Sequence, residues 1–264
     1  MTYLTAALLG TIQGLTEFLP VSSTAHLLIA SRWLRYQDPG GAFTVMIQFG
    51  SILAVAWLYR ERVTGVLKGL PSNHNARRVA LMMVVAVVPT LVAGALFAKY
   101  VQTVLYESLR IIAVSFICGG IVILLVERFR PAPVVSDAEQ TPIPRAFGVG
   151  VCQVLALVPG VSRSGATIVG GMLMGLDRSA AAEFSFLLAI PTMGAAFVYQ
   201  LVGSWQFLTA ERTAEIGIGF VTAFLSAAVV LRPFLTFVRR AGFAPFAWYR
   251  VAFGAVLLAL HPAG

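Results

Sequence analysis

Polar residues interrupt an apolar N-terminal stretch in a pattern that could support acid–base or metal chemistry. In the run GTIQGLTEFLPVSSTAHL, residues 10–27, Gln13 and Glu17 are four residues apart and therefore share one face of a helix. An ionised carboxylate inside an apolar segment is costly, so its default interpretation is a functional one. The alternative is a structural glutamate that is paired with an arginine.

Three hydroxyls and a histidine follow in the same run. Pro20 ends the first helix, and we expect one of the next serines to cap the second helix, Ser22 being the more natural cap. Capping explains one hydroxyl but not Ser22, Ser23 and Thr24 together. His26 follows Ser23 by three residues on the same face, and it could be its general acid or base, although a lone histidine on an apolar helix is more often structural. We therefore expect Ser23 to be the nucleophile, assisted by His26.

A second polar break lies in the run LVPGVSRSGATIVGG, residues 157–171. Gly160 and Gly165 would free the backbone to turn, and its N–H groups with the following helix N-terminus would form an anion cradle. Arg163 adds a planar fork that suits phosphate oxygens. Its alternative role is a salt bridge to Glu17, which is compatible with phosphate binding. The two runs together indicate phosphoryl transfer or phosphate hydrolysis on a lipid substrate.

The composition places these motifs in a membrane. The chain has 264 residues, of which 58% are hydrophobic and 11% are charged, whereas a soluble domain carries roughly 25% charged residues. Long apolar runs favour an all-α integral membrane protein over a strand barrel. The net charge of +8 comes from residues in short loops between apolar runs, so we expect membrane lipids as partners and no nucleic acid.

Both motifs fall within apolar regions that are interrupted at their middle. A spanning helix needs roughly 20 apolar residues. Regions 3–30 and 146–176 are broken by the two polar runs, and each predicts a re-entrant helix–loop–helix pair, because broken backbone at membrane depth must be buried in protein or line a wet cavity. Six other segments are predicted to span: 42–59, 79–98, 109–126, 180–202, 214–231 and 243–260.

The sequence repeats itself approximately about a proline-rich linker, 127–145, within a single polytopic domain, 1–264. Each half, 1–126 and 146–264, would hold one re-entrant pair and three spans. Because three spans end on the opposite side of the membrane from where they began, the second half would be inverted relative to the first. Three matches support the repeat at an offset of 140, with a one-residue gap near the proline: GTIQ (10–13) with GVCQ (150–153), LPVSST (19–24) with VPGVSRS (158–164), and Arg110 with Arg250. Arg250 could form a structural ion pair or a second phosphate contact.

The basic residues predict the orientation of the chain. With the N-terminus outside, the inner loops 60–78, 127–145, 177–179 and 232–242 hold 12 Lys and Arg residues, and the outer loops 31–41, 99–110 and 203–213 hold 5. Basic residues favour the cytoplasmic side. Both termini are therefore expected outside, and the two re-entrant loops enter from opposite faces and can meet.

The motifs GLTEFLPVSSTAH and PGVSRSGAT resemble the two signature motifs of the undecaprenyl-diphosphate phosphatase family, membrane enzymes linked to bacitracin resistance. The resemblance extends along nearly the whole chain, including QFGSILAV (48–55) and WYRVAFG (248–254). It implies hydrolysis of undecaprenyl diphosphate to undecaprenyl phosphate, the lipid carrier recycled for peptidoglycan synthesis. It also implies a divalent cation, Mg²⁺ or Ca²⁺, and a site that opens to the periplasmic face of the bacterial cytoplasmic (inner) membrane.

The resemblance also assigns roles to individual residues. It implies that Ser23, His26, Glu17 and Arg163 are catalytic and that Gln13 and Glu17 bind the metal. Gln13 stands where many members have glutamate, so one negative ligand is missing, although an amide oxygen can still coordinate a hard cation. Ala25 replaces a common glycine and indicates a helical position. The implied substrate-binding residues are Ser22, Thr24, Gly160, Ser162, Ser164, Gly165 and Thr167.

A transporter is the rival interpretation, because inverted repeats with broken helices also describe secondary carriers, and a flippase for the lipid carrier could use the same cavity. A serine and a histidine beside an arginine favour the enzyme, since binding alone would not need them. A homodimer is an arrangement that the sequence permits.

Overall fold

The protein is built from helices. The computed structural model describes residues 3–101, 108–204 and 207–260, and this part of the chain contains no β-strand, only an isolated bridge between Val135 and Leu176. Helices satisfy their backbone hydrogen bonds internally, as an apolar surrounding requires. The predicted all-α class is confirmed.

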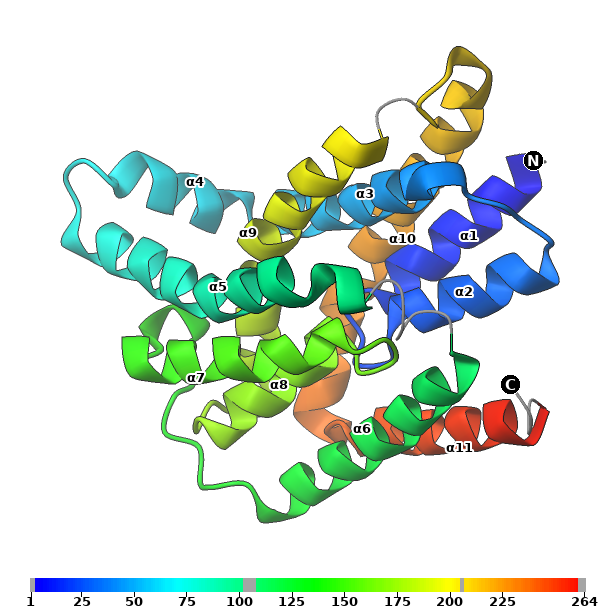
Figure 1. Cartoon of the computed structure of the whole chain (residues 1–264). Helices are drawn as coiled ribbons and strands as arrows, with labels where there is room; N and C mark the ends of the chain where they lie inside the picture. Colours follow the sequence, from blue (N-terminus) through cyan, green and yellow to red (C-terminus); the bar gives the residue numbers. More distant parts are fainter. Residues whose placement is uncertain (1–2, 102–107, 205–206, 261–264) are drawn as a thin grey trace.

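The two predicted breaks fall between pairs of short helices, α1 and α2 in the first half and α7 and α8 in the second (Figure 1). The helices of the first half are α1 (Tyr3–Thr16), α2 (Ser23–Trp33), α3 (Ala42–Leu58), α4 (Arg60–Gly69), α5 (His74–Tyr100) and α6 (Leu109–Phe129). Those of the second half are α7 (Ile143–Val154), α8 (Arg163–Leu173), α9 (Arg178–Ser204), α10 (Ala210–Ala241) and α11 (Ala244–Leu260).

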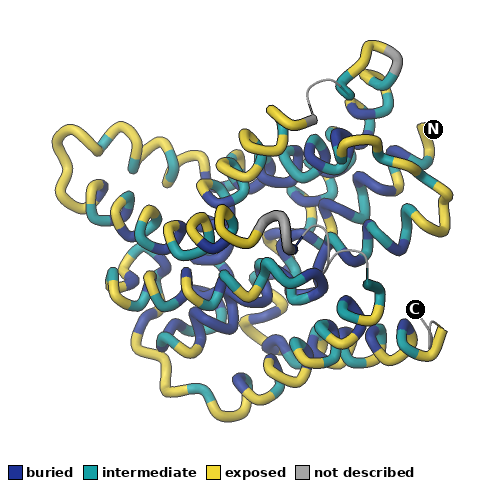
Figure 2. The backbone as a smooth tube through the Cα atoms, viewed as in Figure 1, coloured by how far each residue is buried: buried dark blue, intermediate teal, exposed yellow. Residues whose placement is uncertain are grey.

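Five helices among the described residues are long and apolar enough to cross a membrane, namely α3 extended to Pro39, α5, α6, α9 and α10. They correspond to five of the six predicted spans. The sixth, α11, is apolar but has only 17 residues, fewer than the roughly 20 that a typical span needs. A further difference is α4, a short polar helix with no buried residue inside the predicted loop 60–78, which lies at the exposed edge of the molecule (Figure 2).

Close helix contacts depend on glycine at two corresponding positions. A Cβ at Gly10 of α1 would overlap the carbonyl of Gly219 on α10, and a Cβ at Gly150 of α7 would overlap the carbonyl of Ala86 on α5. Small residues allow helix backbones to approach closely where lipid provides no hydrophobic drive for association. These contacts hold the first helix of each interrupted pair against a long helix of the other half.

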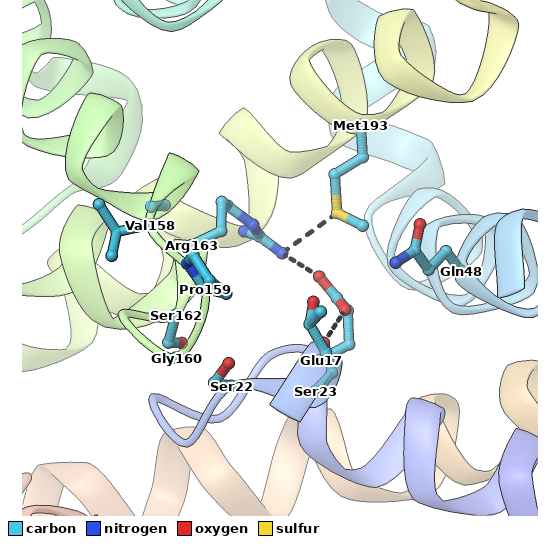
Figure 3. Close-up of a pocket in the computed structure, with 12 residues that line it drawn as sticks. Glu17, Ser22, Ser23, Gln48, Val158, Pro159, Gly160, Ser162, Arg163 and Met193 are labelled. Atoms are coloured by element: carbon cyan, nitrogen blue, oxygen red, sulfur yellow. Dashed lines mark hydrogen bonds and ion pairs between the residues drawn. The ribbon is translucent and has the colours of Figure 1, made fainter. Parts of the chain in front are cut away.

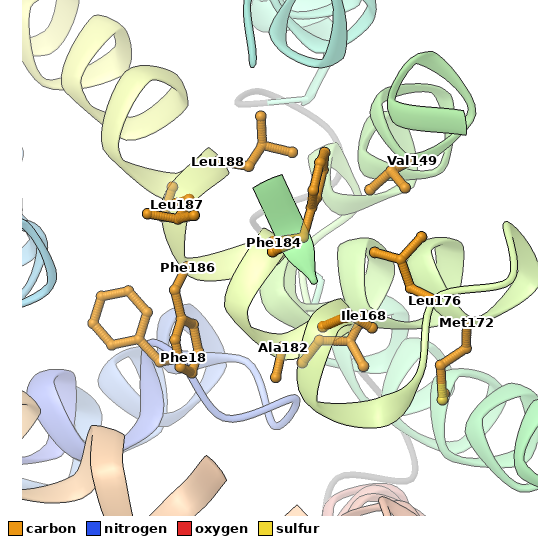
Figure 4. Close-up of a cluster of buried hydrophobic side chains, with 14 of the residues drawn as sticks. Phe18, Val149, Ile168, Met172, Leu176, Ala182, Phe184, Phe186, Leu187 and Leu188 are labelled. Atoms are coloured by element: carbon orange, nitrogen blue, oxygen red, sulfur yellow. The ribbon is translucent and has the colours of Figure 1, made fainter. Parts of the chain in front are cut away.

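A buried aromatic cluster fixes the first break (Figure 4). Phe18, the residue after Glu17, is fully buried and packs edge-on against Phe186 of α9, with ring centroids 5.5 Å apart. Phe184 and Ile168 continue the cluster toward α8. Because Phe18 cannot leave this cluster without opening a cavity, the backbone at Glu17 is held in place.

Candidate functional site

The two breaks meet at a cavity of about 120 Å³, to which α3 and α9 also contribute (Figure 3). The meeting of two loops that lie some 140 residues apart in the sequence agrees with the prediction. The lining residues are Glu17, Ser22, Ser23, Thr24, Gln48, Ala156, Val158, Pro159, Gly160, Ser162, Arg163 and Met193.

The residues directly before α2 and α8 at the cavity are two serines with unusual backbone conformations. Ser22 precedes α2 with φ 65°, and Ser162 precedes α8 with φ 76°. Positive φ is uncommon for residues other than glycine and costs about 1–3 kcal/mol. The Ser162 hydroxyl caps α8 by accepting the Gly165 N–H at 3.1 Å. Ser22 makes no such bond, so its expected capping role is wrong: with ψ 90° it stands outside the cap geometry, and it lines the cavity instead.

The Glu17 carboxylate is the centre of the polar contacts. Its Oε2 accepts hydrogen bonds from the Ser23 hydroxyl at 2.5 Å and from the Gln13 amide at 2.8 Å. Its Oε1 accepts one from Arg163 Nη2 at 3.1 Å, which forms the salt bridge considered in the sequence. Glu17 is only 6% exposed, and a carboxylate so deeply buried requires this degree of compensation.

Arg163, the first residue of α8, is held from several sides. Its Nη1 donates to the Ser185 carbonyl at 2.9 Å, and the guanidinium lies 5.6 Å from the centre of the Phe18 ring. Its buried Nε has no hydrogen-bond partner in the described part of the chain. An unsatisfied buried donor is costly, so this N–H is available to an acceptor that enters the cavity.

Among the described residues, His26 makes no hydrogen bond to Ser23, contrary to the expected pair. Its Nδ1 lies 2.8 Å from the Ser22 carbonyl and its Nε2 lies 2.6 Å from the Tyr249 hydroxyl, while its ring stacks on Phe253 of α11. A carbonyl can only accept, so this network assigns the ring proton to Nδ1 and makes Nε2 the acceptor for Tyr249. Helix spacing brought Ser23 and His26 to one side of α2, but Glu17 binds the hydroxyl and α11 binds the ring.

Three residues expected to bind substrate do not line the cavity. Ser164 and Thr167 are fully buried in α8, where their hydroxyls donate to the Leu19 carbonyl at 2.7 Å and to the Ser185 hydroxyl at 2.7 Å. Gly165 lies in the first turn of α8 rather than at a turn of the loop. They face protein because α8 is almost entirely buried; Ser164 connects the two loops, and Thr167 connects α8 to α9.

Three lining residues, Gln48, Ala156 and Met193, were not identified as site residues from the sequence. Gln48 of α3 points toward Glu17, and its amide makes no hydrogen bond to another described residue (Figure 3). An amide inside an otherwise apolar span was the signal that could have identified it. Met193 of α9 accepts a 3.4 Å contact from Arg163 at its sulfur, and nothing in the local sequence distinguishes it.

Gln13 and Glu17, the two predicted metal ligands, lie side by side. The Gln13 amide nitrogen donates a hydrogen bond to Glu17, and Gln13 Oε1 is buried without a hydrogen-bond partner among the residues that the structure describes. Among the described residues there is no group of three or more His, Cys, Asp or Glu side chains that could enclose a metal. Glu17 and the Gln13 Oε1 are oxygen donors, the type that a hard cation such as Mg²⁺ prefers, and such a cation completes its shell with water and substrate phosphates.

Residues 6–256 match the family model described as "Bacitracin resistance protein BacA". The chain belongs to this family. The match covers both loops and every residue of the cavity, so the geometry described above lies entirely within the family's common region.

Curated relatives agree over nearly their whole length. The chain is 47% identical over 253 residues to "Undecaprenyl-diphosphatase 1" of Agrobacterium fabrum, covering 96% of this chain and 94% of the relative. It is 48% identical over 257 residues to "Undecaprenyl-diphosphatase" of Paracoccus denitrificans, covering 97% and 96%. It is 48% identical over 258 residues to "Undecaprenyl-diphosphatase 2" of Paramagnetospirillum magneticum, covering 97% and 98%. The resemblance seen in the two motifs is confirmed.

Proposed function

We propose that this protein hydrolyses undecaprenyl diphosphate to undecaprenyl phosphate and inorganic phosphate, and so recycles the lipid carrier of peptidoglycan synthesis. One observation carries the chemistry: in a cavity between two broken helix pairs, the Ser23 hydroxyl donates to a buried carboxylate that also binds Arg163. A nucleophile for phosphoryl transfer needs a hydroxyl that is hydrogen-bonded to a base and that lies near a cation such as a guanidinium. The names of the relatives supply the substrate.

In the first step Ser23 Oγ attacks the terminal phosphorus. The Oγ–P bond forms, the bond from phosphorus to the bridging oxygen breaks, and undecaprenyl phosphate leaves. The proton of the hydroxyl passes to Glu17 Oε2, 2.5 Å away. Arg163 stabilises the charge on the transferred group with its fork and its unpartnered Nε–H.

In the second step water attacks the phosphoserine. The new O–P bond forms as the P–Oγ bond breaks, inorganic phosphate leaves, and Ser23 Oγ recovers its proton from Glu17. His26 takes no proton in this scheme, since both of its ring nitrogens are engaged by Ser22 and Tyr249. It positions α2 against α11.

Gln13 and Glu17 would hold a divalent cation, with Gln48 as a neighbouring amide at the cavity. When bound, the cation neutralises part of the charge of the diphosphate. The unpartnered Gln13 Oε1 supports this proposal, because a buried acceptor without a donor is otherwise destabilising.

The two halves are proposed to form an inverted repeat, with both termini and the opening of the site on the periplasmic side of the inner membrane. Several observations support the repeat. The second helices of the interrupted pairs, α2 and α8, have 11 residues each and follow serines of positive φ. The first helices exchange partners, since α1 packs on α10 and α7 packs on α5. The orientation rests on the distribution of Lys and Arg.

Purified protein in detergent tests this function. We expect Mg²⁺-dependent release of inorganic phosphate from undecaprenyl diphosphate, with none from Ser23→Ala. Ser51→Ala is the matched control, because Ser51 is a fully buried serine of α3 whose hydroxyl bonds to the Ile47 carbonyl and to no other described residue. Lack of phosphate release by the wild type, together with transfer of the lipid across vesicle bilayers, would instead identify a carrier.

A further inference from the structure

We propose that Arg250 of α11 is a positioning residue that orients the backbone of the second loop toward the phosphate and places an unpaired positive charge behind it. This inference rests on the proposed phosphatase function. It concerns a side chain that does not line the cavity and that neither signature motif contains.

The Arg250 side chain joins three separate segments of the chain. It is completely buried, and within the described ranges its guanidinium donates only to backbone carbonyls. Its acceptors are Pro20 O and Val161 O for Nη1, both at 3.0 Å, Gly160 O at 2.9 Å and Ser115 O at 3.1 Å for Nη2, and Phe116 O at 3.4 Å for Nε. One cation thus holds the first loop, the second loop and α6 together.

The ion pair that was one expected role of Arg250 is not formed. No salt bridge to a carboxylate joins it among the described residues, so its charge is compensated by carbonyl dipoles and by the Phe116 ring, 5.1 Å away. Each of its three nitrogens has at least one acceptor, and the guanidinium fork reaches carbonyls on both sides. A buried cation without an anion costs several kcal/mol. The charge therefore remains available to attract an anion in the adjacent cavity.

The bond to Val161 O has a consequence for the peptide that follows it. In a trans peptide the C=O and N–H groups point in opposite directions. Because the Val161 carbonyl points to Arg250, the N–H of Ser162 points away from it, and Ser162 lines the cavity. This N–H makes no hydrogen bond to another described residue, and it precedes the first turn of α8, in which the Gly165 N–H is already bonded to the Ser162 hydroxyl. Arg250 thereby sets the direction of a donor that can stabilise a phosphoryl oxygen.

Gly119 of α6 provides the space that this arrangement needs. A Cβ at Gly119 would overlap Arg250 Nη2 and would meet Cζ at 2.8 Å. Gly119→Ala should therefore displace the guanidinium without changing a cavity residue. Gly254→Ala is the control in the same α6–α11 contact, because the three atoms nearest to a Cβ there are Ala113 O at 2.7 Å, Ile117 Cγ1 at 2.8 Å and Phe116 Cβ at 3.0 Å, and none belongs to the guanidinium.

The experiment compares Gly119→Ala, Arg250→Lys and Gly254→Ala in detergent, with kcat and KM measured for undecaprenyl diphosphate per folded protein. Thermal unfolding with and without orthovanadate reports folding and anion binding independently of turnover. We expect kcat to fall at least about 10-fold in Gly119→Ala and Arg250→Lys, and KM to change by a smaller factor. The reason is that misdirected hydrogen-bond donors weaken binding of the transition state more than binding of the substrate. Protection by vanadate should fall in both variants, and Gly254→Ala should keep both properties.

Wild-type kcat and wild-type vanadate protection in folded Gly119→Ala would overturn the inference. Equal losses in Gly119→Ala and Gly254→Ala would also overturn it, since they would indicate helix packing alone. If Arg250→Lys does not fold, Gly119→Ala still decides, because it keeps the arginine. Failure of the proposed function is distinguished by the wild type itself, which would then release no phosphate.

Discussion

Replacing Glu17 by glutamine tests the proton transfer in the proposed mechanism. The substitution keeps the shape of the side chain but removes the acceptor charge from a group that contacts Ser23 at 2.5 Å and Arg163 at 3.1 Å. Removing a general base typically costs about 10²–10⁴ in rate. We expect kcat to fall by at least about 100-fold, because the amide cannot take the proton of the Ser23 hydroxyl.

The same substitution should also lower stability. The side chains of Arg163 and Glu17 are 13% and 5% exposed, and removing one partner of a buried pair costs about 3–5 kcal/mol because the other charge is left uncompensated. Thermal unfolding in detergent measures this loss, and phosphate release must be assayed well below the lowered Tm. Glu183→Gln is the matched control: its ion pair with Arg62, 2.9 Å long, is partly exposed and lies outside the cavity, so it should cost about 1 kcal/mol or less and leave kcat unchanged.

A parallel His26→Gln variant separates the two candidate bases. His26 bonds to Ser22 and Tyr249 rather than to Ser23, so its loss should weaken the contact between α2 and α11 and reduce kcat less than Glu17→Gln does. The reasoning would be refuted if folded Glu17→Gln kept more than a tenth of wild-type kcat, or if His26→Gln were the more damaged of the two.

Four further outcomes are expected. Arg163→Lys keeps the charge but loses the fork, so turnover should fall at least about 100-fold, and near-wild-type turnover would make the arginine structural. Ser23→Ala should abolish hydrolysis. Ser22→Ala should leave Tm almost unchanged, because the Ser22 hydroxyl caps no helix. Loss of hydrolysis in Ser22→Ala but not in Ser23→Ala would exchange their roles. Gln13→Glu adds a second carboxylate, so Mg²⁺ should raise Tm more than it does in the wild type, and half-maximal activity should need less Mg²⁺. A Mg²⁺ response identical to that of the wild type would argue against residue 13 as a metal ligand. A cysteine label at Ser72, in a variant without native cysteines, should react only from the cytoplasm, and labelling from outside intact cells would invert the orientation.

Composition and local pattern determined much of the architecture. Long apolar runs with few charges predicted the all-α membrane class and five spans that the helices confirm. Polar runs around Pro20 and Pro159 predicted the two helix breaks. Such features follow from the sequence because they depend on the solvent and on neighbours along the chain. Two predicted segments differ from the structure: the polar stretch 60–69, predicted as a loop, forms a helix, and α11 is shorter than a typical span.

The site was predicted as a set of residues but not as a set of bonds. The sequence identified Glu17, Ser23 and Arg163, and it named the ion pair between the first and the last as an alternative. It paired Ser23 with His26, since helical spacing reports which residues share a face of one element. Which face meets which neighbour depends on contacts between separate elements, and these assigned Ser23 to Glu17 and His26 to Tyr249.

Only the tertiary structure decided how the two loops are held together. Arg250 and Gln48 lie in apolar helices far from both motifs, and their types alone left their roles open. Packing of α6 against α11 brings the Arg250 guanidinium between the loops, and packing of α3 brings Gln48 to the cavity. The sequence determined where the chain must break and which charges lie at the breaks, because local preferences and the apolar surroundings determine both. The partners of those charges were decided by helix packing, because their distances depend on how helices separated by a hundred residues or more come together.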